Sequence, residues 1–384
     1  MRFEFATATR IIFGVGTLKE AGPLAKEFGR HALVVTGRDT SRAKQLTDML
    51  RGGGVDSTLF AVKGEPEIES VEICATLAKR QACDFVISIG GGSAIDAGKA
   101  IAAMLTNEGA LLDYLELIGK GKALTKPSAP FIAIPTTAGT GSEVTRNAVL
   151  GSPQHRVKVS LRSPLMLARV ALVDPELSRT LSPALTASTG LDALTQLIEP
   201  YVCTRANPMT DAICREGMAR VARSLRAAVN DGSNMKARED MSIASLLGGL
   251  TLANAGLGAV HGFAGPFGGM FPAPHGAICA ALLPHVLEIN CRALRSRQPG
   301  SEALQRYKEV ALLLTGNSRA SAEDAATWAA ALVSELRIPR LGIYGMTNDH
   351  VAELIEKAVH ASSMKPNPIV LTPEELAEIV ERAR

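Results

Sequence analysis

The sequence predicts two domains, an α/β domain over residues 1–180 and an all-helical bundle over residues 181–384. In the first half, short β-branched runs alternate with helical patterns, which is typical of a parallel sheet covered by helices on both faces. After residue 175 strand patterns nearly vanish, and long helical patterns follow one another. A chain of 384 residues is long enough for two domains with separate cores.

The first half is predicted to alternate strands and helices in a regular order. β-branched runs that end at glycine or proline predict the strands, and amphipathic runs between them predict the helices. The expected strands are 31–36, 57–62, 84–89 and 131–134, with a last β-branched run at 170–173, and the expected helices are 41–51, 68–81 and 93–105.

The second half is predicted to be helical throughout. Several of its helices begin with capping residues, such as Thr372 followed by Pro373 and Glu375. The expected helices are 184–203, 208–229, 237–258, 303–314, 321–336, 350–359 and 373–384.

Composition excludes several classes of protein. The formal net charge is +3 and no basic run stands out, so no nucleic-acid partner is expected. The first 14 residues lack the layout of a signal peptide, which favours a cytoplasmic protein. None of the six cysteines forms a C-x-x-C pair, so they are expected to be small buried hydrophobic residues in a reducing compartment. They are Cys74, Cys83, Cys203, Cys214, Cys279 and Cys291.

A long stretch without acidic or basic residues lies between Asp240 and Glu288. Residues 241–260 approach the length of a membrane span, but they contain serines, a threonine, an asparagine and several glycines. A buried helix of a large protein is therefore expected, and no membrane partner. His261 and His275 lie in this stretch, and imidazoles in an apolar interior need partners.

A glycine-rich turn, Gly90-Gly91-Gly92-Ser93, follows the third expected strand, with Asp96 in the helix after it. Glycines allow a close approach of the backbone to a phosphate, and a helix N-terminus offers unpaired N–H groups to an anion. The turn therefore predicts a diphosphate site. The alternative is a tight connection between strand and helix that binds no ligand.

A second loop of hydroxyl groups and glycines follows the strand at 131–134. Its Thr136, Thr137, Thr140 and Ser142 are suited to lining a site for sugar, amide and phosphate groups. Two such loops at the ends of neighbouring parallel strands indicate a Rossmann-like sheet, because open α/β sheets bind ligands at that edge.

A metal site is predicted from one carboxylate and two imidazoles. The segment from Thr189 to Gln196 opens a helix on which Asp192 and Gln196 share a face. His261 ends the charge-free helix, and His275 follows Pro274. One carboxylate and two histidines leave a coordination position for substrate, as catalytic metal sites require. Histidines satisfied within an apolar core are the alternative.

With these motifs in place, the sequence resembles the iron-containing, group III alcohol dehydrogenases over nearly its whole length. The resemblance implies the dehydroquinate synthase-like/iron-containing alcohol dehydrogenase fold, with the active site in the cleft between the two domains. It also implies NAD(P)-linked interconversion of alcohols and carbonyl compounds, a homodimer or higher homo-oligomer, and Lys158 among the cofactor-binding residues. The motifs that carry it are Ile12-Phe13-Gly14-x-Gly16, Gly90 to Lys99, Pro135 to Glu143, Gly190-Leu191-Asp192-Ala193-Leu194, His261-Gly262 and Pro274-His275-Gly276.

Two positions depart from the family pattern. Gln196 stands where the family usually has a histidine as fourth metal ligand, and Gly265 stands where it usually has a histidine near the nicotinamide. Gln196 could be a weak metal ligand, bind a metal-bound water or contact substrate. Related glycerol dehydrogenases resemble a three-ligand pattern with zinc, so Fe2+ and Zn2+ are both expected. Gly265 suggests a pocket for a larger or more polar substrate, whose proton leaves through water or a ribose hydroxyl.

The choice of nucleotide is predicted from the residues after the first expected strand. Relatives that prefer NAD often have an aspartate where Gly37 stands, and Gly37 leaves room for a 2′-phosphate. Arg38 or Arg42 could pair with that phosphate, whereas Asp39 argues for NAD. The balance favours NADP, although both arginines could also be solvated surface charges.

Three other functions fit parts of the sequence. A metal-free reductase of the maleylacetate reductase type shares the fold and tolerates changes at metal positions. A dehydroquinate synthase-like lyase also uses a carboxylate and two histidines for zinc, but it needs a dense set of basic residues that the stretch 241–287 lacks. A non-catalytic nucleotide-binding protein is the third.

Overall fold

The computed structural model describes residues 2–384 and divides them into two compact units. The α/β unit comprises Phe5–Thr137 and Gly141–Arg179. The helical unit comprises Thr180–Arg384 together with the short segment Ala138–Thr140 and residues 2–4.

The α/β unit is built on a six-stranded sheet in which every pairing is parallel, in the order β1-β8-β5-β4-β2-β3. The predicted parallel sheet is confirmed, and the turns after β2, β4 and β5 leave one edge of it because these strands are neighbours in register. The strands of the sheet are β1 (Arg10–Phe13), β2 (His31–Thr36), β3 (Asp56–Ala61), β4 (Phe85–Gly90), β5 (Phe131–Pro135) and β8 (Val170–Val173).

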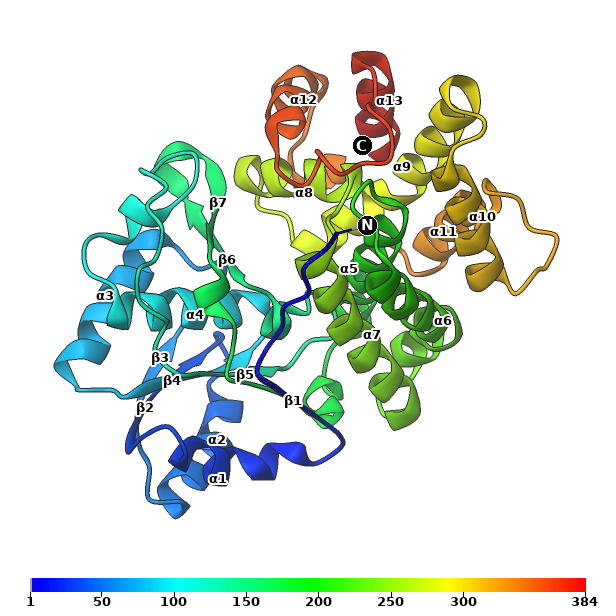
Figure 1. The fold of residues 1–384 in the computed structure, drawn as a ribbon. Coiled ribbons are helices and arrows are strands. Elements are labelled where there is room, and N and C mark those ends of the chain that lie inside the picture. The colour runs from blue at the N-terminus through cyan, green and yellow to red at the C-terminus, as the bar shows by residue number, and fades with distance from the viewer. Residues whose placement is uncertain (1) are drawn as a thin grey trace. The chain divides into compact units, whose positions relative to one another are not determined.

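Helices cover both faces of this sheet. Helices α1 (Ala21–Lys26) and α2 (Ser41–Gly52) lie on one face, and α3 (Ile68–Arg80) and α4 (Gly92–Thr106) lie on the other (Figure 1). Helix α4 is buried over most of its length, so it reads as a nearly continuous run of small apolar residues rather than as an amphipathic pattern.

Three elements of this unit were not expected from the sequence. Strand β1 forms the edge beside β8, and β6 (Asn147–Ser152) and β7 (Val157–Arg162) form a separate antiparallel hairpin. The hairpin alternates buried and partly exposed residues along β6, and β7 has the alternating apolar and polar sequence of a half-buried strand, a pattern that the prediction missed.

The helical unit contains nine α-helices among the described residues. Helix α5 is buried almost throughout because α6, α7 and α9 surround it. The helices are α5 (Pro183–Val202), α6 (Pro208–Asn230), α7 (Met235–Asn254), α8 (Ala259–Met270), α9 (His275–Arg297), α10 (Glu302–Thr315), α11 (Asp324–Glu335), α12 (Val351–His360) and α13 (Pro373–Ala383).

The stretch without charged residues folds differently from the prediction. A single helix over 237–258 was expected, but α7 ends at Asn254 and α8 begins at Ala259, with an angle of 95° between them. Ala255 ends α7 in a non-helical conformation, and Gly258 precedes α8 in an extended conformation, so the chain changes direction between the two helices. Helix α9 was missed, because its Pro284 and the prolines before it argue against a helix in the sequence.

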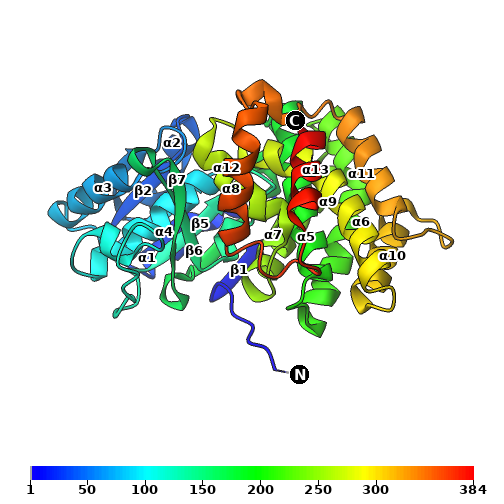
Figure 2. The same cartoon turned by 90° about the horizontal axis from the view of Figure 1, so that it is seen from above.

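Helix α9 is long and apolar enough to cross a membrane, but 83% of its most apolar window is buried within the protein. It packs against α5, α8, α11 and α13 (Figure 2). Its apolar character is therefore that of a core helix.

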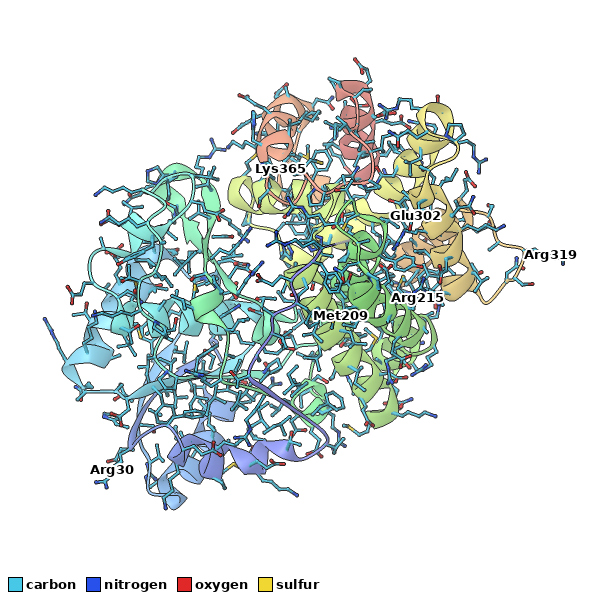
Figure 3. All side chains as sticks on the ribbon, in the orientation of Figure 1. Arg30, Met209, Arg215, Glu302, Arg319 and Lys365 are labelled. Atoms are coloured by element: carbon cyan, nitrogen blue, oxygen red, sulfur yellow. The ribbon has the colours of Figure 1, made fainter. Side chains whose placement is uncertain are left out.

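The outer helices are joined by ion pairs. Arg215 on α6, labelled in Figure 3, donates to Glu309 on α10 and to the hydroxyl of Tyr201 on α5. Glu302 at the start of α10 accepts from Arg306, which also pairs with Asp211 on α6. These contacts connect three helices around the core of the unit.

Candidate metal centre and nucleotide-binding turns

Three helices bring together four side chains that could hold a metal ion. Asp192, His261 and His275, the three predicted ligands, lie together with Cys279, which was not predicted. One potential ligand atom from each residue lies within 4.8 Å of the others. Binding of a metal by these residues remains a prediction.

The helices position these side chains in ways that correct the sequence-based description. Asp192 lies midway along α5 rather than opening a helix, and His261 lies in the first turn of α8 rather than ending a helix. His275 is the first residue of α9, and Cys279 follows one turn later on the same face. The break before α8 therefore contributes to the site, because it places His261, in the first turn of α8, beside the side chains from α5 and α9.

Asp192 is the clearest sign that this group binds something. Its side chain is buried, and its Oδ1 has no hydrogen-bond partner within residues 2–384. The nearest nitrogen atoms are Nε2 of His261 at 3.5 Å and Nε2 of His275 at 3.8 Å, too distant for good hydrogen bonds. A buried carboxylate oxygen without a partner is costly, and a cation at the centre of the group would satisfy it.

Glu199 orients one of the imidazoles. Its Oε2 lies 2.6 Å from Nδ1 of His261, and its Oε1 accepts the backbone N–H of Val260 at 2.7 Å. Since a carboxylate accepts hydrogen bonds, Nδ1 carries a hydrogen and Nε2 faces the group of four. Metal-binding histidines usually have such a carboxylate partner. Glu199 was not predicted as a site residue. Its spacing could have indicated it, because it lies two helical turns after Asp192 and so shares its face of the helix.

Electrostatics in the group favour positive charge. Burial lowers the pKa of His261, but Cys279, Glu199 and Asp192 outweigh it, and the pKa lies well above its usual value. The pKa of His275 is raised in the same way, against burial, by Cys279 and Asp192. Burial raises the pKa of Asp192, yet the two imidazoles bring it below its usual value. Surroundings that stabilise imidazolium charge also suit a divalent cation.

Gln196 lies beside the group, one turn after Asp192 on α5. It is buried, and its Oε1 has no hydrogen-bond partner in the described part of the chain. Gly248 on α7 makes room for it, because a Cβ there would lie 3.3 Å from Cβ of Gln196. This unpaired oxygen suits each of the three roles predicted for Gln196.

The glycine-rich turn lies where β4 meets α4. Helix α4 begins at Gly92, one residue before the predicted start, and Gly91 at its N-cap provides no capping side chain. The first N–H groups of the helix, those of Gly92 and Ser93, therefore have no capping side chain, as a diphosphate site requires. A Cβ on Gly90 would lie 2.6 Å from Cβ of Ala94, so the tight turn itself demands glycine there. Ser93 follows in the first turn.

The second loop runs beside this turn. The N–H of Thr136 donates to the carbonyl of Gly90 at 2.9 Å, and the side chain of Thr137 lies next to Gly91. Thr140 belongs to the helical unit by its packing.

Asp96 and Ser142 are placed inside the α/β unit. The hydroxyl of Ser142 donates to Oδ1 of Asp96, and Oδ2 accepts the N–H of Val149 at 3.0 Å. Lys99, fully buried, donates to the carbonyl of Ser142 at 2.9 Å. These contacts hold the second loop against α4, which gives Asp96 and Ser142 a positioning role. A direct contact of either with the nucleotide stays a prediction.

The residues predicted to select the nucleotide follow β2. Gly37 has open space where a side chain would stand, and Arg38 is exposed. Asp39 accepts the N–H of Ser41 at 2.9 Å, and this hydrogen bond lowers the pKa of Asp39. Lys158 on β7 pairs with Glu65 at 3.2 Å.

A parallel sheet with a phosphate-type turn, and a helical unit with a buried group of side chains that could hold a metal, are the features that a nicotinamide- and metal-dependent oxidoreductase requires. A sequence model described as iron-containing alcohol dehydrogenase matches residues 8–175, and one described as the C-terminal part of the Fe-containing alcohol dehydrogenase family matches residues 186–384.

Individual relatives agree over the whole length. Alcohol dehydrogenase 4 of Saccharomyces cerevisiae is 36% identical over 377 residues, covering 97% of this chain and 96% of the relative. A 1,3-propanediol dehydrogenase of Citrobacter freundii is 36% identical over 398 residues, covering 99% and 98%. The crystal structure of a 1,3-propanediol oxidoreductase matches all of both chains with a TM-score of 0.90 at 34% identity. The structure of an alcohol dehydrogenase from Oenococcus oeni also matches all of both chains, with a TM-score of 0.91 at 32% identity.

The chain therefore belongs to the iron-containing alcohol dehydrogenase family, and it is an oxidoreductase that acts on alcohols. Membership of this family implies NAD(P) and a metal as cofactors.

Proposed function

We propose that this protein interconverts an alcohol and an aldehyde or ketone by hydride transfer, at a metal held by Asp192, His261 and His275. The observation that carries this proposal is the buried, unpaired Oδ1 of Asp192 between two imidazole Nε2 atoms. A cation supplies the partner that this oxygen lacks.

The side chains of this chain have distinct roles in the proposed reaction. A bound metal supplies a Lewis acid for the substrate oxygen. When bound, NAD(P) would supply the acceptor for the hydride of the carbinol carbon. Glu199 fixes the orientation of His261, and the stretch 241–287 provides uncharged walls that exclude water. Since Gly265 cannot take a proton, the alcohol proton leaves through water or a ribose hydroxyl.

We propose NADP as the preferred nucleotide. The carboxylate of Asp39 is already engaged at the start of α2, and Gly37 leaves space that a 2′-phosphate can occupy near Arg38. Replacement Gly37→Asp should shift the ratio of kcat/KM values towards NAD, because a carboxylate repels the phosphate and binds the ribose hydroxyls. An unchanged ratio would contradict this choice.

The substrate belongs to the alcohols, but the relatives differ in what their names specify. They include dehydrogenases of 1,3-propanediol, long-chain alcohols, choline and methanol. A panel of these alcohols and their aldehydes, with NAD and NADP, together with elemental analysis of the purified protein, tests the proposed function.

Variant Asp192→Asn tests the metal site within the same experiment. It should lose bound metal and at least about 100-fold in kcat/KM, since even partners of metal ligands contribute 10–100-fold. The matched control is Asp349→Asn, an exposed carboxylate of the same unit, which should behave as the unchanged chain. Full activity of metal-free protein would instead support a reductase of the maleylacetate reductase type. Consumption of substrate without net reduction of the nucleotide would support a lyase. The absence of any turnover would support a non-catalytic nucleotide-binding protein.

We further propose that the protein works in the cytoplasm as a homodimer or higher homo-oligomer. Light scattering of the purified chain tests the oligomeric state, and a monomer would contradict it.

A further inference from the structure

Cys279 is the member of the metal-binding group that the family pattern does not explain. The usual fourth ligand of the family is replaced by Gln196, yet a thiol from another helix lies within the same group. We propose that Cys279 binds the metal directly as a thiolate, giving a four-ligand centre that prefers Zn2+ to Fe2+. This inference rests on the metal-dependent function proposed above, and it assigns the fourth ligand and the metal.

The distances within the group fit a tetrahedral centre that includes sulfur. Zinc binds sulfur at about 2.3 Å and nitrogen or oxygen at about 2.0–2.2 Å, so a tetrahedron has S···N edges of about 3.5 Å and N···O edges of about 3.4 Å. Sγ of Cys279 lies 3.6 Å from Nε2 of His275 and 3.8 Å from Nε2 of His261. The two edges to Oδ1 of Asp192 are 3.5 and 3.8 Å. If each of these four distances shortened by up to a few tenths of an ångström, all four would match the edges of a zinc tetrahedron.

The position of Cys279 on α9 explains how it reaches the centre. It follows His275 by four residues, so both side chains project from the same face of the helix. The thiol is fully buried and free of any disulfide, and its polar neighbours include the Nε2 atoms of both imidazoles. A sulfur that served only to fill the core would be expected among apolar groups instead.

The chemistry of the donors decides the metal. A thiolate is a soft ligand, which shifts a mixed nitrogen and oxygen site towards zinc. The thiol releases its proton to solvent when the metal–sulfur bond forms, so metal binding should release a proton. Four protein ligands leave substrate to enter as a fifth, a coordination that catalytic zinc centres can reach.

Substitution of cobalt for the native metal tests the proposal directly. Chelator-treated protein is loaded with Co2+, and its near-ultraviolet spectrum is recorded for a thiolate-to-cobalt charge-transfer band. The unchanged chain should show the band. Cys279→Ser should lose it and bind Co2+ at least about tenfold more weakly. Cys291→Ser, a buried thiol three turns further along the same helix, should keep both the band and the affinity.

A rescue variant separates loss of a ligand from loss of structure. Adding Gln196→His to Cys279→Ser places an imidazole one turn after Asp192, and it should restore the Co2+ affinity without restoring the band. If Cys279→Ser does not fold, X-ray absorption of the zinc-loaded unchanged chain decides, because a sulfur neighbour at about 2.3 Å supports the proposal and its absence overturns it.

The outcomes distinguish this inference from the proposed function. If the unchanged chain binds Co2+ and oxidises alcohols but shows no thiolate band, the sulfur ligand is overturned and the metal-dependent function stands. If the thiolate-to-cobalt band persists in Cys279→Ser, the proposal that Cys279 is the sulfur ligand is likewise overturned. If the unchanged chain binds no metal, both proposals fail.

Discussion

Gly265 is the residue from which a pocket for larger substrates was predicted. It lies one turn after His261 on α8, and a Cβ built there meets no other atom within 4 Å. Replacement Gly265→His should fit without strain and fill that space. We expect kcat/KM to fall about tenfold or more for bulky alcohols and to change little for small ones, because only the former need the space.

The pH profile gives a second measurement on the same variant. The new imidazole titrates near neutral pH and could carry the proton of the alcohol, so kcat/KM should gain a dependence on pH around that range. Gly265→Ala is the control for added bulk without a titratable group. The pocket hypothesis fails if Gly265→His leaves both the substrate profile and the pH dependence as they were.

Glu143 makes the stability of the α/β unit depend on pH. Burial raises the pKa of this carboxyl to about 7, although Lys99 opposes the shift. An unfolded chain loses the same proton near pH 4.5, so the folded chain holds more protons between these values. The stability from Glu143 is therefore complete below about pH 4.5 and is lost as pH rises through about 7.

Replacement Glu143→Gln should remove this part of the pH dependence. We expect the Tm of the variant to fall less between about pH 5 and pH 8 than that of the unchanged chain, since the amide does not ionise. Burial also lowers the pKa of Lys99, and the effect of Lys99 on the pH dependence of stability has the opposite sign. Parallel curves of Tm against pH for the two proteins would show that the proton on Glu143 does not matter.

The sequence predicted the individual residues of the site unevenly. His261 and His275 were found because they lie in a stretch without charged residues, and Asp192 was added as the carboxylate of a three-ligand set. The structure brings the three together. Cys279 was treated as core because none of the six cysteines forms a C-x-x-C pair. Its four-residue spacing from His275 has meaning only once α9 is known to be a helix.

At the scale of elements, α4 depends on close contact with the sheet. A Cβ on Gly98 would lie 1.9 Å from Oγ of Ser88 on β4 and 2.8 Å from the ring of Phe131 on β5. The hydroxyl of Ser88 also donates to the carbonyl of Ala94, which anchors the first turn of the helix. Glycine is therefore required for packing, although it is a poor helix former.

Replacement Gly98→Ala should destabilise the α/β unit by on the order of 1–3 kcal/mol, because overpacking outweighs the better helix propensity of alanine. The displaced helix start should also weaken nucleotide binding. Gly265→Ala is the matched control in open space, where alanine should be neutral or stabilise by up to about 1 kcal/mol. Denaturant unfolding and nucleotide titration measure both effects. Equal stability of the two variants would contradict the contact.

The predicted boundaries of an element agree with the structure where a single sequence pattern marks both of its ends. The strands at 31–36 and 170–173 match β2 and β8 because β-branched runs are bounded by turn residues. The division of 237–258 into α7 and α8, and the whole of α9, escaped because glycine and proline in a fully buried helix look like loop signals. Tertiary packing overrides local propensity there.

At the scale of the whole molecule, the two units have separate cores, and the residues proposed to bind the metal and the nucleotide lie in different units. The metal-binding group lies within the helical unit, on α5, α8 and α9, and the glycine-rich turns lie in the α/β unit. Removal of the metal should therefore affect the helical unit first. Within it, α8 should be most sensitive, because it is short and its four glycines and Pro266 make it a weak helix by itself.

Hydrogen exchange measured by mass spectrometry can resolve this difference. We expect a chelator to accelerate exchange in peptides from α8 and the start of α9, where His261 and His275 would lose their link to Asp192, while peptides from β2, β4 and β5 keep their protection. Asp192→Asn should reproduce the pattern without chelator, which removes the concern that the chelator acts elsewhere. Uniform acceleration across both units, or none in α8, would show that the metal does not hold these helices together.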